Sequence, residues 1–213
     1  MGSSASSGPS VPRIEALLWD IGGVLLSNAW DHADRAAAAA RFGLDLPGLN
    51  ARHDLRAEAL ETGRLSWARY LDEVVFTEPR PFDRAEFQAF VESRSVAYPV
   101  ALRLARRLRS SGRFTMAVLN NEVSELNDLR IRRFGLSEIF HVFFSSSTTG
   151  RRKPDPAAYR FALSLLHLAP PECLFLDNRA QNIEAAARLG LGVLQVRDPD
   201  RLPEDLMAVG ISP

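Results

Sequence analysis

The sequence predicts an α/β fold in which a doubly wound parallel sheet of about five strands carries an inserted domain of four helices. Three observations lead to this prediction. Five short apolar runs end at polar or turn residues, as buried strands do. Helical patterns alternate with the last four runs, which is typical of parallel sheets with right-handed crossovers. A long segment after the first run, residues 29–95, has helical periodicity and no convincing strand.

The five expected strands are short and mostly apolar. The first covers residues 14–19 and stops at Asp20, where Gly22 and Gly23 indicate a tight turn. The other four strands are expected at residues 114–119, 141–144, 173–176 and 192–196. Helices of the sheet domain are expected at residues 99–110, 123–134, 156–168 and 180–189.

The inserted segment is expected to form four helices. Their apolar periodicity covers residues 34–42, 51–60, 66–75 and 83–92, and prolines indicate a loop at 77–83. We therefore expect an α/β core built from residues 14–28 and 96–213, with a helical domain at 29–95. Residues 1–13, which are small and polar, are expected to be a disordered leader or the remnant of a tag.

Composition excludes several classes of protein. The 213 residues include 26 basic and 26 acidic side chains, so the formal net charge is zero and neither a nucleic-acid nor a membrane partner is expected. A hydrophobic content of 46% excludes general disorder. The single cysteine, Cys173, excludes a disulfide framework or a cysteine-rich zinc site. No apolar run spans a membrane and no signal peptide is present, so we expect a cytoplasmic protein.

Polar residues follow four of the expected strands at the point where each strand ends or shortly after it. Open parallel sheets bind ligands at the carboxyl ends of their strands, so these residues are the candidates for a site. They are Asp20, Asn120 with Asn121, Lys153 after an eight-residue loop, and Asp177 with Asn178. Any one of them alone could be an ordinary loop or capping residue. Lys153 is the only lysine beside 25 arginines, which favours a need for a compact ammonium there.

Four segments carry a resemblance to a known family. WDIGGVLL (19–26), VLNN (118–121), GRRKPDPAAY (150–159) and LFLDNRAQNIEAA (174–186) resemble the four ordered motifs of the haloacid dehalogenase-like (HAD) hydrolase superfamily. The intervals between Asp20, Asn120, Lys153 and Asp177 are 100, 33 and 24 residues. These intervals are similar to those of members with a helical (C1) cap inserted between the first two motifs. The resemblance implies a Rossmann-like core and a hydrolase, most often a phosphatase.

The resemblance also implies roles for individual residues. Asp20 would be the nucleophile that forms a covalent intermediate. Mg²⁺ would be held by Asp20, the backbone carbonyl of Gly22 and Asp177, which are hard oxygen ligands. Lys153 would screen the two carboxylates and stabilise charge on the transferring group, and Asn120 would take part in catalysis with it. Binding of the phosphoryl group is implied for Asn120, Asn121 and Lys153. Asn178 and Asn182 would have supporting roles. The substrate would be a small phosphorylated metabolite, because a helical cap closes over the site. The sequence leaves the oligomeric state open between monomer and dimer.

Three positions depart from the phosphatase pattern. Gly22 stands where an aspartate normally serves as general acid and base, a contribution of roughly 10²–10⁴-fold. Asn120 replaces a serine or threonine, and Asn178 replaces a second acid. Residues that could substitute for the missing acid, if they are not simply capping or surface residues, are Asp31, His32 and Glu122.

Two other functions stay open. The departures are compatible with a catalytically weak or inactive member that binds a ligand or a partner protein. A metal-independent haloacid dehalogenase is the other alternative, and Tyr159 stands where those enzymes carry a tyrosine. Without a cation, however, Asp177 would form a like-charge pair with Asp20, which argues against it. Tyr159 and Cys173 are better explained as packing residues, as are Trp30 and Trp67. His53, His141 and His167 lie in separate segments and predict no zinc site.

Overall fold

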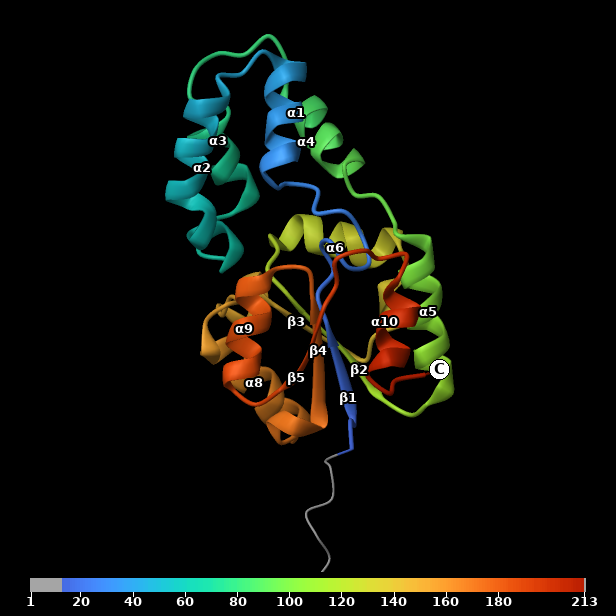
Figure 1. Ribbon diagram of the computed structural model, residues 1–213. Coiled ribbons are helices and arrows are strands. Elements are labelled where there is room, and N and C mark those ends of the chain that lie inside the picture. Colours follow the sequence, from blue (N-terminus) through green and yellow to red (C-terminus); the bar gives the residue numbers. More distant parts are fainter. Residues whose placement is uncertain (1–12, 213) are drawn as a thin grey trace, which may run out of the picture.

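The computed structural model describes residues 13–212 and contains one parallel sheet of five strands (Figure 1). The strand order is β3-β2-β1-β4-β5, so β1 lies in the centre and pairs with β2 on one side and β4 on the other. Leu18 of β1, for example, lies between Ala117 and Phe175. The strands are β1 (Ala16–Trp19), β2 (Thr115–Asn120), β3 (Val142–Ser145), β4 (Cys173–Asp177) and β5 (Gly192–Gln195). The predicted doubly wound α/β fold is confirmed.

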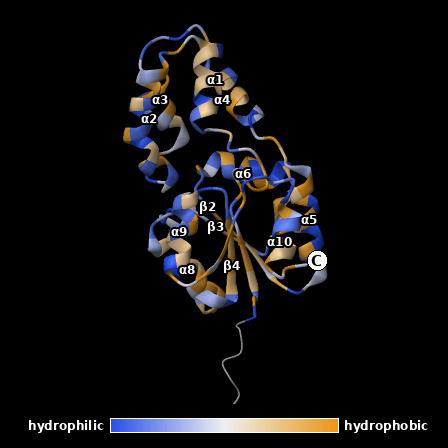
Figure 2. Ribbon diagram, viewed as in Figure 1, coloured by the Kyte–Doolittle hydropathy of each residue, from blue (hydrophilic) through white to orange (hydrophobic). Residues whose placement is uncertain are grey.

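Helices cover both faces of the sheet, because successive side chains of a strand point to opposite faces. In β1, Leu17 and Trp19 belong to the apolar cluster on the side of α5 and α10, whereas Ala16 and Leu18 belong to the cluster on the side of α8 and α9. Both faces are therefore buried, and the strands are almost wholly apolar (Figure 2). The helices of the core are α5 (Pro99–Ser111), α6 (Ser124–Arg133), α7 (Ser146–Thr149), α8 (Pro156–Leu166), α9 (Ala180–Arg188) and α10 (Leu202–Ala208).

Four helices follow β1 and pack into a separate bundle beyond the carboxyl ends of the strands (Figure 1). They are α1 (His32–Phe42), α2 (Leu46–Glu61), α3 (Trp67–Val74) and α4 (Arg84–Ser93). Each begins at a side chain that accepts a hydrogen bond from a backbone N–H of the first turn: Asp31, Asp45, Ser66 and Asp83. An aromatic cluster holds the bundle together, with Phe42, Phe82 and Phe87 in mutual contact.

Three elements differ from the sequence-based expectation. The segment expected as a loop before Lys153 contains the short helix α7, whose Ser146 hydroxyl donates to the carbonyl of Glu61 in the helical bundle at 2.5 Å. Helix α10 was not predicted. Helix α2 begins at Leu46 rather than at residue 51, because Asp45 caps it and a proline occupies its first turn. Residues 1–12 of the expected leader lie outside the described residues.

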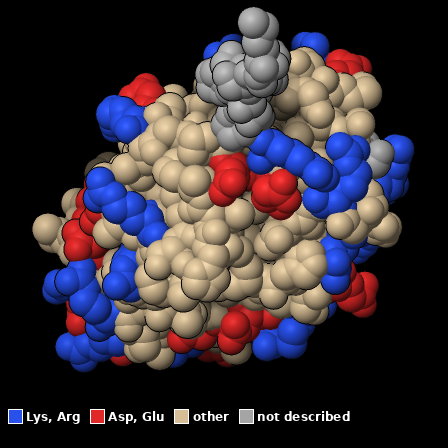
Figure 3. Space-filling view, turned by 90° about the horizontal axis from the view of Figure 1, so that it is seen from below, with Lys and Arg blue, Asp and Glu red and all other residues tan. Residues whose placement is uncertain are grey.

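Charged side chains of both signs are distributed over the surface. Seen from below the view of Figure 1, basic and acidic residues lie interspersed around the rim of the molecule, and a few of both signs also lie near the middle of this face (Figure 3). Within residues 13–212, no helix is long and apolar enough to cross a membrane.

Candidate active site

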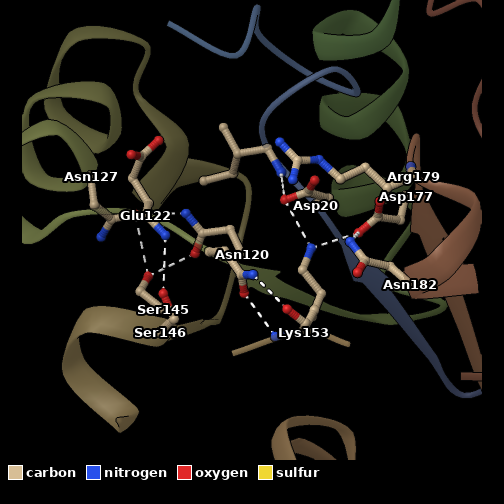
Figure 4. A network of polar contacts seen from close by, with 12 residues as sticks. Asp20, Asn120, Glu122, Asn127, Ser145, Ser146, Lys153, Asp177, Arg179 and Asn182 are labelled. Carbon is tan, nitrogen blue, oxygen red and sulfur yellow. Dashed lines mark hydrogen bonds and ion pairs between the residues drawn. The ribbon is translucent and has the colours of Figure 1, made fainter. Parts of the chain in front are cut away.

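Asp20, Lys153 and Asp177 meet at the carboxyl edge of the sheet (Figure 4). Asp20 directly follows β1 and Asp177 ends the neighbouring β4, so the pairing of these two strands brings the carboxylates together. The Lys153 Nζ atom lies 3.1 Å from Asp20 Oδ1 and 2.6 Å from Asp177 Oδ2. Lys153 is 2% exposed and Asp177 is fully buried. One ammonium thus separates two buried carboxylates.

The environment of Asp20 opposes its ionisation in part. The pKa of Asp20 is raised overall, to about 6. Burial raises it most, the positive charge of Lys153 lowers it, and the negative charge of Asp177 raises it. The backbone N–H of Ile21 donates to Oδ1 at 2.8 Å. Asp20 lines a cavity described below, and within the described residues its Oδ2 atom accepts no hydrogen bond from the protein.

Asp177 is held by three donors. Its Oδ1 atom accepts from the backbone N–H of Arg179 at 2.7 Å, and its Oδ2 atom accepts from Lys153 and from Asn182 Nδ2 at 2.9 Å. The Tyr159 hydroxyl donates to the carbonyl of Asn182 at 2.9 Å and thereby fixes the first turn of α9. A carboxylate can accept about four hydrogen bonds or metal contacts, so Asp177 keeps some capacity for a cation.

The two asparagines after β2 have different surroundings. The Asn120 Nδ2 atom donates to Asn127 Oδ1 at 3.0 Å, and Asn120 Oδ1 accepts from the Ser145 hydroxyl at 2.9 Å. One N–H of the Asn120 amide is left for a ligand. The Asn121 side chain instead makes two bonds to the backbone of Lys153: Nδ2 donates to its carbonyl at 2.8 Å, and Oδ1 accepts from its N–H at 2.9 Å. Asn121 therefore positions Lys153.

The oxygen atoms around Asp20 suit a hard divalent cation. Asp20 and Asp177 supply carboxylates, and the backbone carbonyl of Gly22 lies in the same turn. Asn178 Oδ1 is buried and has no hydrogen-bond partner within residues 13–212. Buried polar oxygens are nearly always paired, so this atom is available as a ligand to a cation or as an acceptor from water. The Asn178 amide lies against Gly23, and a side chain at position 23 would collide with this amide.

The space beside Gly22 is filled by another residue. A Cβ atom at position 22 would lie 2.9 Å from Asn28 Oδ1. Asn28 Nδ2 in turn donates to Asp31 Oδ2 at 3.1 Å, which holds the amide in place. Asn28 therefore occupies the space that a side chain at position 22 would need.

A cavity of about 650 Å³ lies between this edge of the sheet and the helical bundle. The three residues considered as substitutes for the missing acid all line it. Burial alone would raise the pKa of Asp31, but hydrogen bonds from the Asp34 N–H and from Asn28 lower it overall. Burial raises the pKa of Glu122, although Arg130 donates to its carboxylate. His32 is exposed at the start of α1.

The cavity also contains residues that sequence reasoning missed. They come from the segment between β1 and α1, from the helical bundle, from α6 and from the loops beside Lys153 and Asp177: Asn28, Arg35, Glu61, Arg130, Arg152 and Arg179. His53, considered only as a zinc ligand, lines it as well. One signal was Arg35, a long charged residue at the start of the alanine-rich stretch of α1. Trp30 lines the cavity, whereas Trp67 packs inside the bundle, and Tyr159 and Cys173 are buried in the core.

Comparisons with known proteins agree with this arrangement. The family described as haloacid dehalogenase-like hydrolase matches residues 14–190. Phosphoserine phosphatase from Thermus thermophilus is 30% identical over 204 residues, which cover 91% of this chain and 75% of that protein. Flavin mononucleotide hydrolase 1 from Arabidopsis thaliana is 38% identical over 77 residues, or 36% of this chain and 31% of that protein. The chain spans less than two fifths of the length of the first curated relatives that it matches.

The fold is also found among solved structures. A HAD family enzyme from Bacteroides thetaiotaomicron, in complex with magnesium and inorganic phosphate, superposes with a TM-score of 0.71 at 19% identity. The match covers 89% of this chain and 98% of that one. This likeness shows a shared fold, and the family match over residues 14–190 and the 30% identity to the phosphoserine phosphatase show that the chain belongs to the haloacid dehalogenase-like hydrolases.

Proposed function

We propose that the chain is a Mg²⁺-dependent phosphatase that hydrolyses a small phosphorylated metabolite through an aspartyl-phosphate intermediate on Asp20. The observation that carries the proposal is the buried cluster of Asp20, Lys153 and Asp177, in which Asp20 and Lys153 line the cavity and Asp177 lies buried beside Lys153. The names of two relatives, a phosphoserine phosphatase and a phosphoglycolate phosphatase, support a phosphorylated substrate.

Asp20 is the group that attacks phosphorus. Its Oδ1 atom is held by Ile21 and Lys153, so Oδ2 is the oxygen that forms the new bond to phosphorus while the bond to the ester oxygen breaks. The departing alkoxide takes a proton and leaves as an alcohol. Water then attacks the phosphorus of the acyl phosphate, which releases inorganic phosphate and restores the carboxylate.

Lys153 stabilises the charge that develops during this transfer. Its ammonium has three N–H donors, of which two are directed to Asp20 and Asp177. The third can donate to a phosphoryl oxygen, and the free N–H of Asn120 can donate to another. Such preorganised donors lower the barrier because they need no rearrangement at the moment of reaction.

The residues present fit Mg²⁺. Asp20, the Gly22 carbonyl, Asp177 and, directly or through water, Asn178 would hold it, and all four offer hard oxygen ligands. When bound, the ion supplies positive charge that offsets the two carboxylates and the phosphate dianion. The solved relative that contains magnesium and phosphate supports this part of the proposal.

Hydrolysis of a fluorogenic or chromogenic aryl phosphate tests the proposal directly. An aryl oxide is a good leaving group, so the missing acid at position 22 matters little. We expect p-nitrophenyl phosphate to be hydrolysed with Mg²⁺ and not with EDTA. Asp20→Asn should abolish the activity, whereas Asp128→Asn, at an exposed position of α6, should leave it unchanged. Equal rates for wild type and Asp20→Asn would disprove the proposal.

A second candidate function is binding without turnover. Asn28 fills the space beside Gly22, so no acid stands next to the nucleophile at that point. A protein that binds a phosphorylated ligand or a partner would need the cavity but not the acid. Capture of beryllofluoride by Asp20, followed by ¹⁹F NMR, distinguishes the two functions, because only a competent nucleophile forms the aspartyl adduct.

A further inference from the structure

The helical bundle places a buried positive charge against the cavity, and no ion pair within the described residues joins it to a carboxylate. Arg35 of α1 is 7% exposed and lines the cavity. Its Nε atom donates to Asn50 Oδ1 at 2.7 Å, and one terminal nitrogen donates to the backbone carbonyl of Trp30 at 3.0 Å. Both partners are neutral. The charges of Asp31, Asp34 and Asp54 act on Arg35 from a distance, but within residues 13–212 none of these carboxylates forms an ion pair of 4.0 Å or less with its guanidinium.

The other buried or partly buried cations of the cavity differ from Arg35 in this respect. Lys153 pairs with two carboxylates, Arg130 pairs with Glu122, and Arg152 pairs with a carboxylate of the bundle. Buried charges in proteins are normally paired, because an isolated ion loses its hydration without compensation. Three of the five N–H groups of Arg35 have no acceptor within the described part of the chain.

His53 of α2 adds a second donor to the same wall. Its Nδ1 atom lies 2.8 Å from the hydroxyl of Tyr70, and this hydroxyl accepts from the indole N–H of Trp30 at 2.8 Å. The indole can only donate, so the proton of the Tyr70 hydroxyl is directed to His53 Nδ1. The neutral ring then carries its own proton on Nε2. Burial and the charge of Arg35 both lower the pKa of His53, to about 4, which agrees with a neutral ring.

Two of the carboxylates that line the cavity are engaged by groups other than Arg35. Asp31 caps α1 and accepts from Asn28, and Glu122 accepts from Arg130. Neither is within ion-pair distance of Arg35. The wall that Arg35 and His53 form therefore offers hydrogen-bond donors and positive charge, and its complement is an anionic group that is rich in acceptors.

We infer that Arg35 and His53 form a second anion-binding subsite, which selects phosphate monoesters with a carboxylate or a second phosphate at the end remote from the reacting phosphoryl group. The inference rests on the proposed function and specifies the class of its substrate. Arg35 acts here as a specificity-determining residue.

Matched pairs of substrates test the subsite. 3-Phosphoglycerate and glycerol 3-phosphate differ in a carboxylate, and fructose 1,6-bisphosphate and fructose 6-phosphate differ in a phosphate. We expect wild type to prefer the partner with the additional anionic group in at least one pair by about ten- to a hundredfold in kcat/KM, as a charge-assisted hydrogen bond allows. Arg35→Gln should remove that preference, whereas Asp128→Asn, at an exposed position of α6, should keep it. Arg35→Lys, which keeps the charge, should retain part of the preference.

A binding measurement separates failure of the subsite from failure of the proposed function. Calorimetric titration of Asp20→Asn with 3-phosphoglycerate and glycerol 3-phosphate, and with the two fructose phosphates, needs no turnover. A preference that disappears in Asp20→Asn/Arg35→Gln supports the subsite even if wild type hydrolyses no ester. Equal affinities within both pairs, or a preference that persists without Arg35, would overturn it. Circular dichroism of each variant shows whether the fold is kept, and Arg35→Lys serves where Arg35→Gln does not fold.

Discussion

At the scale of single residues, Lys153 is the side chain on which the site depends. It separates two carboxylates that are otherwise buried against each other. Removing one partner of a buried ion pair costs about 3–5 kcal/mol, because the remaining charge is left without compensation. We therefore expect Lys153→Met to lower the free energy of unfolding by about this amount at neutral pH, as measured by urea denaturation.

A double variant provides the control for this prediction. Lys153→Met combined with Asp20→Asn leaves a single carboxylate in the cluster, so part of the lost stability should return. A loss below about 1 kcal/mol in Lys153→Met, as for an exposed ion pair, would contradict the role given to the lysine.

The missing acid at position 22 gives a second prediction at this scale. Gly22→Asp alone places its side chain against Asn28, which is held by Asp31. Gly22→Asp combined with Asn28→Ala makes room for the carboxyl group beside Asp20. We expect the double variant to hydrolyse alkyl phosphates up to about 10²–10⁴-fold faster than wild type, and aryl phosphates much less so, because only poor leaving groups need the proton. An equal gain in the single variant would show that Asn28 is no obstacle.

Only part of the site could be predicted from the sequence, because some of its residues are brought together by tertiary packing. Asp20 and Asp177 end adjacent parallel strands, so a strand pattern is enough to place them together. Lys153 comes from a loop, and it reaches them because Asn121 binds its backbone. Arg35 and His53 lie on helices of the bundle, and their place depends on how that bundle packs over the sheet. No local pattern encodes this packing.

At the scale of elements, the turn after α2 is a contact between the bundle and the core. Gly63 has a φ of 72°, and a Cβ atom there would collide with the carbonyl oxygen of Ser147 in α7. Gly43, after α1, has a similar φ of 64° and no atom within 4 Å of the added Cβ. Replacing either by alanine costs about 1–2 kcal/mol for the left-handed conformation.

The difference between these two glycines isolates the contact itself. We expect Gly63→Ala to lose more unfolding free energy than Gly43→Ala in urea denaturation, and to lower kcat/KM for an aryl phosphate as the bundle shifts. Equal losses in the two variants, with unchanged activity, would show that the turn does not position the bundle.

The sequence predicts the apolar elements better than the polar ones. The three central strands, β2, β1 and β4, are buried on both faces, and the edge strands β3 and β5 are partly buried, so all five form apolar runs that the sequence displays directly. Helix α7 is built from serine and threonine, which are weak helix formers, and it is held by the bond from Ser146 to the bundle. That helix is a product of tertiary contacts, which is why a loop was expected there.

At the scale of the whole molecule, His53 makes stability depend on pH. Burial lowers its pKa to about 4 from an ordinary value of 6.5. The unfolded chain therefore binds more protons than the folded chain between these values, and stability falls as the pH drops from about 6.5 towards 4. At 1.36 kcal/mol per pKa unit, the upper limit for the loss of unfolding free energy is about 3 kcal/mol. The actual loss is smaller, because the ring keeps some contact with solvent.

The raised pKa of Asp20 increases the stability of the folded chain as the pH falls, which opposes the effect of His53. Comparison of variants therefore isolates the contribution of His53. We expect the stability of His53→Gln to fall less steeply with acid than that of wild type, in urea denaturation series between pH 4 and 7. His32→Gln, at an exposed position, is the matched control. Parallel curves for wild type and His53→Gln would show that the ring is not held neutral.

The most direct measurement of the proposed chemistry is the identification of the phosphorylated residue. Wild-type protein mixed with p-nitrophenyl phosphate and Mg²⁺, quenched within one turnover and treated with borohydride, should carry homoserine at position 20 in peptide mass spectra. Asp20→Asn should carry none. Turnover of the ester with position 20 unmodified, or with the modification at another residue, would contradict the role of Asp20 as nucleophile.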